Sequence, residues 1–176
     1  GEFGKIDILV NNAAVFGTVP VEDTTQEYWD NMMAVNMRGT FLCSRMAGEH
    51  MIAARSGKII NMSSITGQVG YPDSAAYNAS KAGVILLTKT LAVEWGRHDI
   101  NVNAICPAYF VTTLTSDHIE VTDSEQIERV RTSIPLGGAR DPKEIVGTAI
   151  YLASSASDYV TGHTLVIDGG WTAGLV

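Results

Sequence analysis

The sequence predicts an α/β fold in which a doubly wound parallel sheet carries helices on both faces. Two observations lead to this prediction. Short apolar runs, each typical of a strand buried in a parallel sheet, alternate with longer segments that carry helix start and stop signals. The resulting order, β-α-β-α-β-α-β, is the pattern of a Rossmann-like sheet covered on both sides, and we expect a single domain over residues 1–176.

The chain begins with a predicted strand and a long helix. Residues 6–10 are apolar almost throughout, which predicts a strand buried on both faces. A turn of small and polar residues follows at 11–14. Residues 24–27 form a capping box that opens a helix. This helix continues to about Arg55, in two pieces that meet near Asn36.

The middle of the chain repeats the alternation. Gly57 is expected to end the first long helix, and residues 58–63 form the next strand. A loop with glycine and proline spans residues 65–74. The longest helix follows at 75–95, with Gly96 as its stop.

The last part of the chain supplies two more strands. Residues 100–105 form a strand that Pro107 ends, and residues 108–121 have little periodicity and form a loop or lid. Asp141 caps a helix that has Pro142 at its first position and runs to about Ala153. The remaining elements are a short helix at 124–132, a strand at 163–167 and a turn at 168–170.

Composition and charge exclude several classes of function. The net charge of −7 argues against nucleic acid or anionic membranes as partners, and no apolar run is long enough to span a bilayer. Cys43 and Cys106 lie in apolar segments, so we expect buried, reduced thiols and a cytoplasmic location. The histidines lack ligand spacing, and no metal site is expected.

Tyr77 and Lys81 carry the main chemical signal. Because they lie four residues apart in a predicted helix, their side chains share a face. A cation beside a phenol lowers the phenol pKa, which would make Tyr77 a usable acid/base. Ser64 ends a predicted strand, where open α/β sheets bind ligands. A partly buried tyrosine capped by a snorkelling lysine remains the structural alternative for this pair.

These motifs, in their order, resemble the single-domain short-chain dehydrogenase/reductase family over essentially the whole chain. Ser64 lies thirteen residues before Tyr77, which is the family's spacing. The matching positions are residues 11–14, Asn36, Ser64, Tyr77, Lys81, and residues 107–112, 135–137, 142–145, 160–162 and 168–170. Ala108 departs from the pattern, because the family has glycine there.

The resemblance implies an NAD(P)-dependent oxidoreductase that interconverts a secondary alcohol and a ketone. Tyr77 would be the general acid/base, with Lys81 beside it. Ser64 would hydrogen-bond the substrate oxygen, and the backbone of Asn36 would hold a water linked to Lys81. The residues that would bind NAD or NADP are Asn11, Ala13, Tyr77, Lys81, Pro107, Phe110 and Thr112. Asn36 and Asn11 also have purely structural interpretations, at a helix irregularity and in a turn.

The same resemblance suggests the substrate and the assembly. The tail from Tyr159 to Trp171 is most similar to relatives that oxidise sugars, sugar acids or polyols, so we expect a small polar substrate. The substrate side would be lined by Phe16, Tyr71, Tyr109 and residues 113–121. The helices at 30–54 and 75–95 are rich in apolar and small residues and would pair in a homodimer or homotetramer.

The family's glycine-rich phosphate turn has no counterpart in this sequence. We therefore expect the chain to be the C-terminal two-thirds of a Rossmann-like domain, with an exposed apolar sheet edge. Alone it would be poorly soluble or bind cofactor weakly. The alternatives are a non-catalytic cofactor-sensing or scaffold protein on this fold, or an inactive fragment; an extended-type epimerase or dehydratase fits less well, because the sequence ends soon after Gly170.

Overall fold

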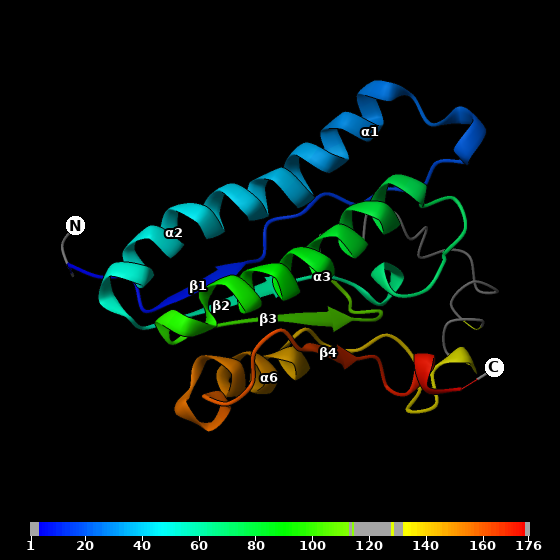
Figure 1. The fold of residues 1–176 in the computed structure, drawn as a ribbon. Helices are drawn as coiled ribbons and strands as arrows, with labels where there is room; N and C mark the ends of the chain where they lie inside the picture. The colour runs from blue at the N-terminus through cyan, green and yellow to red at the C-terminus, as the bar shows by residue number, and fades with distance from the viewer. Residues whose placement is uncertain (1–3, 113, 115–127, 129–131, 175–176) are drawn as a thin grey trace.

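Parallel strands form one sheet in the computed structural model, which describes residues 4–112, 114, 128 and 132–174 (Figure 1). Within these residues the strands are β1 (Ile8–Asn11), β2 (Gly57–Met62), β3 (Ile100–Pro107) and β4 (Thr164–Ile167), in the spatial order β1-β2-β3-β4. Every pairing is parallel, with Asn11 opposite Asn61 and Asn61 opposite Ala104. All the carboxyl ends therefore meet at one edge of the sheet.

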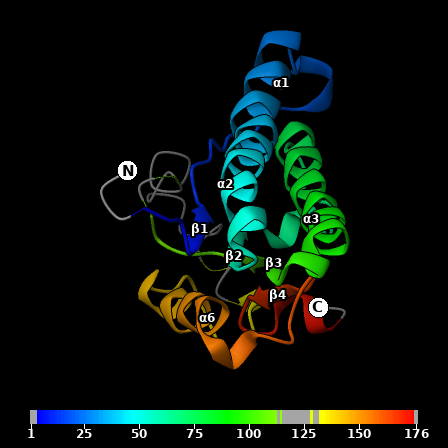
Figure 2. The same ribbon diagram turned by 60° about the vertical axis from the view of Figure 1, so that its left-hand side comes forward.

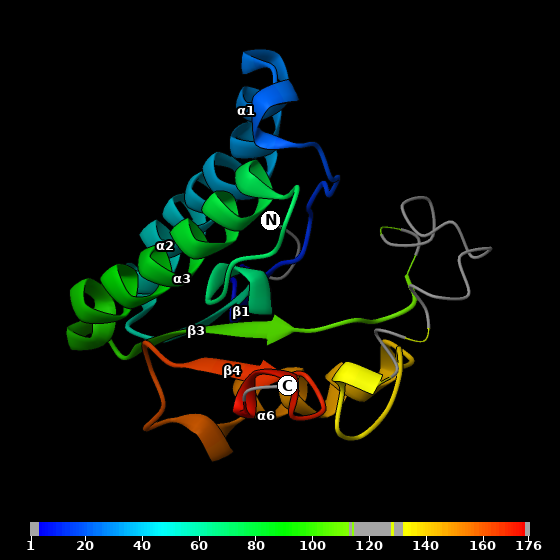
Figure 3. The ribbon, with the colours of Figure 1, turned by 90° about the vertical axis from the view of Figure 1, so that its right-hand side faces the viewer.

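Helices cover both faces of this sheet. The longer ones are α1 (Gln26–Met33), α2 (Thr40–Ala54), α3 (Ala75–Trp95) and α6 (Lys143–Ala153). α2 and α3 lie side by side on one face, and α6 lies on the opposite face (Figure 2). Figure 3 shows the same layers edge-on. The predicted doubly wound α/β fold is confirmed.

The centre of the sheet is also the centre of the core. On one face, Ile59 of β2 and Val102 of β3 pack with Met51 and Leu91 from the two helices above them. On the other face, Ile60 and Ile105 pack against Leu152 of α6. Each of these side chains is less than a tenth exposed. Since alternate residues of a strand point to opposite faces, β2 and β3 serve both layers.

The strand β1 lies at the edge of the sheet, and one prediction about it is wrong. Ile8 and Val10 are 46% and 48% exposed, so β1 is not buried on both faces. The reason is that α6 packs over β2 and β3. Val146 and Ile150 of α6 are exposed as well. The expected exposed apolar edge is confirmed.

The first long helix is interrupted where the sequence predicts. Between α1 and α2, residues Ala34–Gly39 form a π-helical segment, η2, which contains Asn36. The helix begins one residue later than the capping box implies. Thr25 is the cap, and its Oγ1 accepts from the Tyr28 N–H at 3.2 Å. Thr24 is unsuited to that role because its hydroxyl donates to the Pro20 carbonyl at 3.0 Å.

Gly57 does not end this helix, contrary to the prediction. α2 ends at Ala54, and Arg55 caps it in the left-handed region with φ of 51°. Gly57 is the first residue of β2 instead. The Met51 side chain fills the space that a Cβ of Gly57 would occupy, so the glycine is required for packing.

The other predicted elements within the described residues agree closely. α3 has the predicted bounds, and the Asp141 carboxylate accepts from the Lys143 N–H at 2.9 Å at the start of α6. Cys43 is exposed rather than buried, because it faces outward from α2, whereas Cys106 is buried. Most of the predicted helix at 124–132 and most of the 113–121 loop lie outside the described residues. No helix in the described part of the chain is both long and apolar enough to cross a bilayer.

Candidate active site

Ser64, Tyr77 and Lys81 come together beyond the carboxyl end of β2. Ser64 follows that strand and caps a short 3-10 turn, η3 (Ile65–Gly67). Tyr77 and Lys81 lie in the first two turns of α3, one above the other on the helix face turned toward the sheet. The three residues are only 8%, 8% and 3% exposed. A hydroxyl, a phenol and an ammonium group therefore share one largely desolvated region.

The Ser64 hydroxyl is held by its own turn. It accepts from the Thr66 N–H at 3.2 Å and from the Thr66 hydroxyl at 3.1 Å. A side-chain hydrogen bond also joins Ser64 to Tyr77 and lowers the pKa of Tyr77. A bond that Ser64 donates to the phenolate oxygen has this effect.

Lys81 is buried and bonded to the sheet. Its Nζ donates to the Met62 carbonyl at 2.9 Å and lies 5.6 Å from the centre of the Tyr77 ring. Burial lowers the pKa of Lys81 to about 8. The ammonium form still predominates at neutral pH, but it loses its proton under mildly alkaline conditions.

The pKa of Tyr77 is raised, which corrects the expectation of a lowered value. Burial raises it to about 12, and the hydrogen bond from Ser64 offsets only part of this effect. The ring packs edge-on against Phe16, with centroids 4.8 Å apart, in a cluster that includes Met32. Desolvation by these apolar neighbours outweighs the hydrogen bond with Ser64, so the phenol is neutral at physiological pH.

The turn that carries Ser64 is docked on the backbone of α3. The Ser63 hydroxyl donates to the Lys81 carbonyl at 2.8 Å. A Cβ on Gly67 would lie 2.8 Å from the Lys81 carbonyl carbon and 3.0 Å from the Ala82 nitrogen. Because only glycine permits this approach, Gly67 and Ser63 together fix Ser64 relative to Tyr77 and Lys81.

Asn36 links three parts of the site. Its Oδ1 accepts from the Val15 N–H at 2.8 Å, and its Nδ2 donates to the Val15 carbonyl at 2.9 Å and to the Ser80 hydroxyl at 3.1 Å. Ser80 in turn donates to the Tyr77 carbonyl at 2.8 Å. The π-helical turn thus aims the Asn36 amide between the loop after β1 and α3. The Asn36 backbone carbonyl accepts from the Thr40 hydroxyl at 2.8 Å.

The predicted cofactor-binding residues flank this group at the same edge of the sheet. Asn11 ends β1, but its amide turns inward and donates to Ser44 at 2.9 Å and to Asn61 at 2.7 Å. Any ligand contact would therefore use its backbone or its neighbours. The exposed Ala13 follows β1, Pro107 ends β3, Phe110 is buried, and Thr112 is half-buried.

The motifs missed several residues that organise the site. The turn around Ser64 is held by Ser63, Thr66 and Gly67. The Asn36 side chain is held by Ser80 and by the backbone of Val15. Ser80 had a weak signal, because it lies three residues after Tyr77 on the same helix face. The Asn36–Ser80 contact spans 44 residues of sequence, so no local sequence pattern predicts it.

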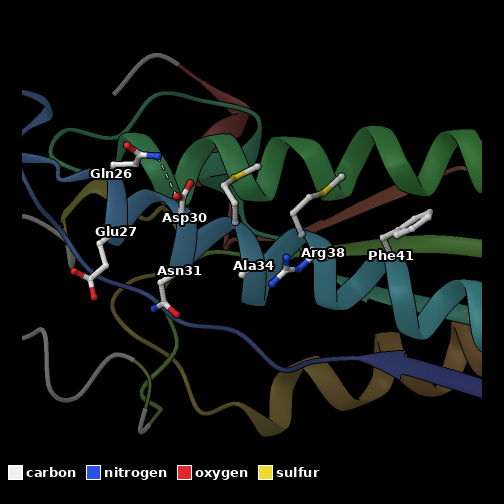
Figure 4. A pocket seen from close by; sticks show the side chains of 9 residues that line it. Gln26, Glu27, Asp30, Asn31, Ala34, Arg38 and Phe41 are labelled. Carbon is white, nitrogen blue, oxygen red and sulfur yellow. Dashed lines mark hydrogen bonds between the residues drawn. The ribbon is translucent and has the colours of Figure 1, made fainter.

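A shallow open groove of about 1160 Å³ lies elsewhere, along α1, η2 and α2 (Figure 4). Its lining is Gln26, Glu27, Asp30, Asn31, Met33, Ala34, Met37, Arg38 and Phe41. None of the predicted catalytic or cofactor-binding residues belongs to it. In the described part of the chain, no three His, Cys, Asp or Glu side chains gather as metal ligands would.

The whole chain is similar to known dehydrogenases. A family model described as enoyl-(acyl carrier protein) reductase matches residues 1–172. The 2-dehydro-3-deoxy-D-gluconate 5-dehydrogenase of Escherichia coli K12 is 41% identical over 98% of this chain and 68% of its own length. An NAD-dependent glycerol dehydrogenase of Listeria innocua is 39% identical over 97% of this chain and 66% of its length.

Solved structures show the same likeness. A gluconate 5-dehydrogenase from Burkholderia cenocepacia J2315, in complex with NADP and tartrate, superposes with a TM-score of 0.94 at 38% identity. The match covers 98% of this chain and 67% of that protein. The chain thus spans about two thirds of the length of these relatives.

Proposed function

Because this chain belongs to the short-chain dehydrogenase/reductase family of NAD(P)-dependent oxidoreductases, we propose that it interconverts a secondary alcohol and a ketone. The substrate is a small polar molecule, a sugar acid, sugar or polyol, as the names of the gluconate and glycerol dehydrogenases suggest. One observation carries the proposal: the Ser64 hydroxyl, the Tyr77 phenol and the Lys81 ammonium converge beyond β2.

Tyr77 is the proton donor and acceptor in this proposal. With its pKa raised to about 12 by burial, the phenol is protonated at neutral pH and can deliver its proton to a ketone oxygen. Oxidation of an alcohol requires the phenolate form of Tyr77, so the rate of oxidation should increase as the pH rises. Ser64 donates to the same substrate oxygen and stabilises the negative charge that develops there.

Lys81 fits a nicotinamide cofactor by the chemistry of its donors. An ammonium group has three N–H donors, and one of them bonds the Met62 carbonyl in the described residues. The others would bond ribose hydroxyl oxygens. Its pKa of about 8 also lets Lys81 pass a proton toward Tyr77 at mildly alkaline pH. When bound, NAD or NADP supplies or accepts the hydride.

The remaining predicted residues would hold and shield the cofactor. Ala13 follows β1 and Pro107 ends β3, the two strands on either side of β2, and Phe110 and Thr112 lie further along the same edge. Asn36 would act through its backbone carbonyl, which would hold a water linked to Lys81. These roles are part of the proposal.

A homo-oligomer, either a dimer or a tetramer, is the proposed assembly. Large apolar side chains on α2 and α3 are exposed: Phe41, Leu42, Met46, Leu86 and Val93. The groove in Figure 4 continues this surface along α1 and η2. Pairing of these helices with those of a second copy would bury it.

A cytoplasmic location is also proposed. Both cysteines are free, and Cys43 is exposed on α2. An exposed thiol persists in a reducing compartment but is prone to oxidation outside it.

The function is tested by following the absorbance of the reduced cofactor. The purified chain is mixed with NAD or NADP, up to concentrations that compensate for weak binding, and with gluconate, glycerol or a ketogluconate. Turnover of at least one pair is expected, with reduction favoured at neutral pH. Absence of turnover with every pair, by a chain that is folded by circular dichroism, would contradict the proposed activity.

A further inference from the structure

Thr66 is placed to control the hydroxyl of Ser64. It lies in η3, two residues after Ser64, and contacts that oxygen twice: its N–H donates at 3.2 Å and its Oγ1 donates at 3.1 Å. A serine hydroxyl accepts through two lone pairs and donates through one hydrogen. Thr66 therefore satisfies both acceptor positions of Ser64 and leaves its hydrogen for another partner.

The other partner in this structure is Tyr77. The hydrogen bond from Ser64 lowers the pKa of Tyr77, as a donor to the phenol oxygen does. The three side chains thus form a directed series, from Thr66 through Ser64 to Tyr77. In such a series each donor polarises the next group and strengthens its bond, most of all where little water competes.

Contacts with α3 fix the position of the turn that carries Ser64 and Thr66. Gly67 packs its Cα directly on the α3 backbone at Lys81, and the Ser63 hydroxyl bonds the Lys81 carbonyl. These contacts bracket Ser64 and Thr66 on either side. The Thr66 side chain is half-buried, and its hydroxyl has Ser64 as its partner in the described part of the chain.

We propose that Thr66 is a positioning residue, whose side-chain hydroxyl fixes Ser64 as a hydrogen-bond donor, toward Tyr77 in the free chain and toward the substrate oxygen when substrate is bound. This inference rests on the proposed oxidoreductase function and deepens it. Without the Thr66 hydroxyl, Ser64 would keep the backbone N–H but could rotate its hydrogen toward the freed space. Tyr77 and the substrate would then lose part of a directed donor.

The test compares Thr66→Val, which removes the hydroxyl and keeps the shape, with Thr66→Ser, which keeps the hydroxyl. The first readout needs no turnover. The chain is labelled with 3-fluorotyrosine, which titrates at lower pH than tyrosine, and the Tyr77 resonance is assigned with Tyr77→Phe. In Thr66→Val the apparent pKa at position 77 should rise by about half a unit, the scale of one weakened hydrogen bond. Thr66→Ser should match the unsubstituted chain.

The second readout is kinetic. Thr66→Val should lower kcat by about 3- to 10-fold, since one hydrogen bond is weakened, while cofactor affinity stays unchanged. Thr66→Ser should restore kcat. An unshifted fluorine titration in Thr66→Val, or an equal shift in Thr66→Ser, would overturn the role of Thr66. If the unsubstituted chain shows no turnover, the proposed function fails, while the titration still decides the role of Thr66.

Discussion

The Nζ of Lys81 lies 5.6 Å from the centre of the Tyr77 ring and bonds the Met62 carbonyl of the neighbouring strand. The lysine thus sits beside the phenol rather than in solvent. Its charge is held between the end of β2 and the first turns of α3, in a place that is only 3% exposed. This burial has consequences for stability as well as for chemistry.

The chain should become more stable at alkaline pH, because the buried ammonium of Lys81 then loses its proton. Its pKa falls from 10.5 to about 8 on folding because of desolvation. Between these values the unfolded chain binds more protons, so the free energy of unfolding rises with pH. From about pH 7 to about pH 9.5, this group alone should add about 1–2 kcal/mol.

Urea unfolding of the chain and of Lys81→Met at both pH values measures this contribution. The stability gap should move in favour of the unsubstituted chain as the pH rises. A gap that stays constant would mean that Lys81 has an ordinary pKa in the folded protein.

Asn36→Ala should destabilise the chain strongly. The change removes the amide that satisfies both the Val15 N–H and the Val15 carbonyl, and it leaves Ser80 with one partner fewer. A loss of about 2–4 kcal/mol in the free energy of unfolding is expected from the unpaired polar groups. Glu22→Ala, at an exposed site before α1, is the control and should change stability by less than about 0.5 kcal/mol. Similar losses in both variants would refute the structural role of Asn36.

Gly67→Ala should disturb the site through the backbone. The new Cβ would lie 2.8 Å from the Lys81 carbonyl carbon, and the atoms it meets are main chain, so η3 must move away from α3. The expected result is a loss of about 1–3 kcal/mol in stability and at least about a tenfold loss of kcat, because Ser64 is displaced. Gly70→Ala, where a Cβ would meet nothing within 4 Å, should leave both values unchanged. Equal behaviour of the two variants would show that the turn is not docked.

Ser64→Ala and Ser63→Ala should separate catalysis from stability. Ser64→Ala removes the donor to the substrate oxygen and should lower kcat by about 10²–10³, while losing the cap of η3 should cost no more stability than Ser63→Ala does. Ser63→Ala removes the bond to the Lys81 carbonyl and should cost about 1 kcal/mol of stability, with a much smaller kinetic effect. Reversed outcomes would exchange the roles assigned to the two serines.

The fold was predictable from sequence because its signals are local. Apolar runs predicted the strands, and the bounds predicted for α3 match those in the structure. The prediction for Gly57 was wrong because a glycine that follows a helix resembles a helix cap. In the structure this glycine makes room for the Met51 side chain, a contact that the local sequence pattern does not encode. The exposure of Ile8 and Val10 depends on where α6 packs, which is equally non-local.

The candidate site was predictable in its members but not in its electrostatics. Spacing alone placed Tyr77 and Lys81 on one helix face, and chain order placed Ser64 at a strand end. The pKa of Tyr77 depends on how deeply Phe16 and Met32 bury the ring. The parts played by Thr66, Gly67 and Ser80 arise from contacts between segments that the motifs do not describe.

The most direct measurement is cofactor-dependent turnover in Tyr77→Phe, beside Tyr159→Phe as the matched control. Tyr159 is fully exposed, so its phenol should be dispensable. Tyr77→Phe should lose about 10²–10⁴ of kcat, the contribution of a positioned acid/base, while cofactor binding and folding are retained. Turnover in Tyr77→Phe equal to that of Tyr159→Phe would contradict the account, because the proton would then come from another group.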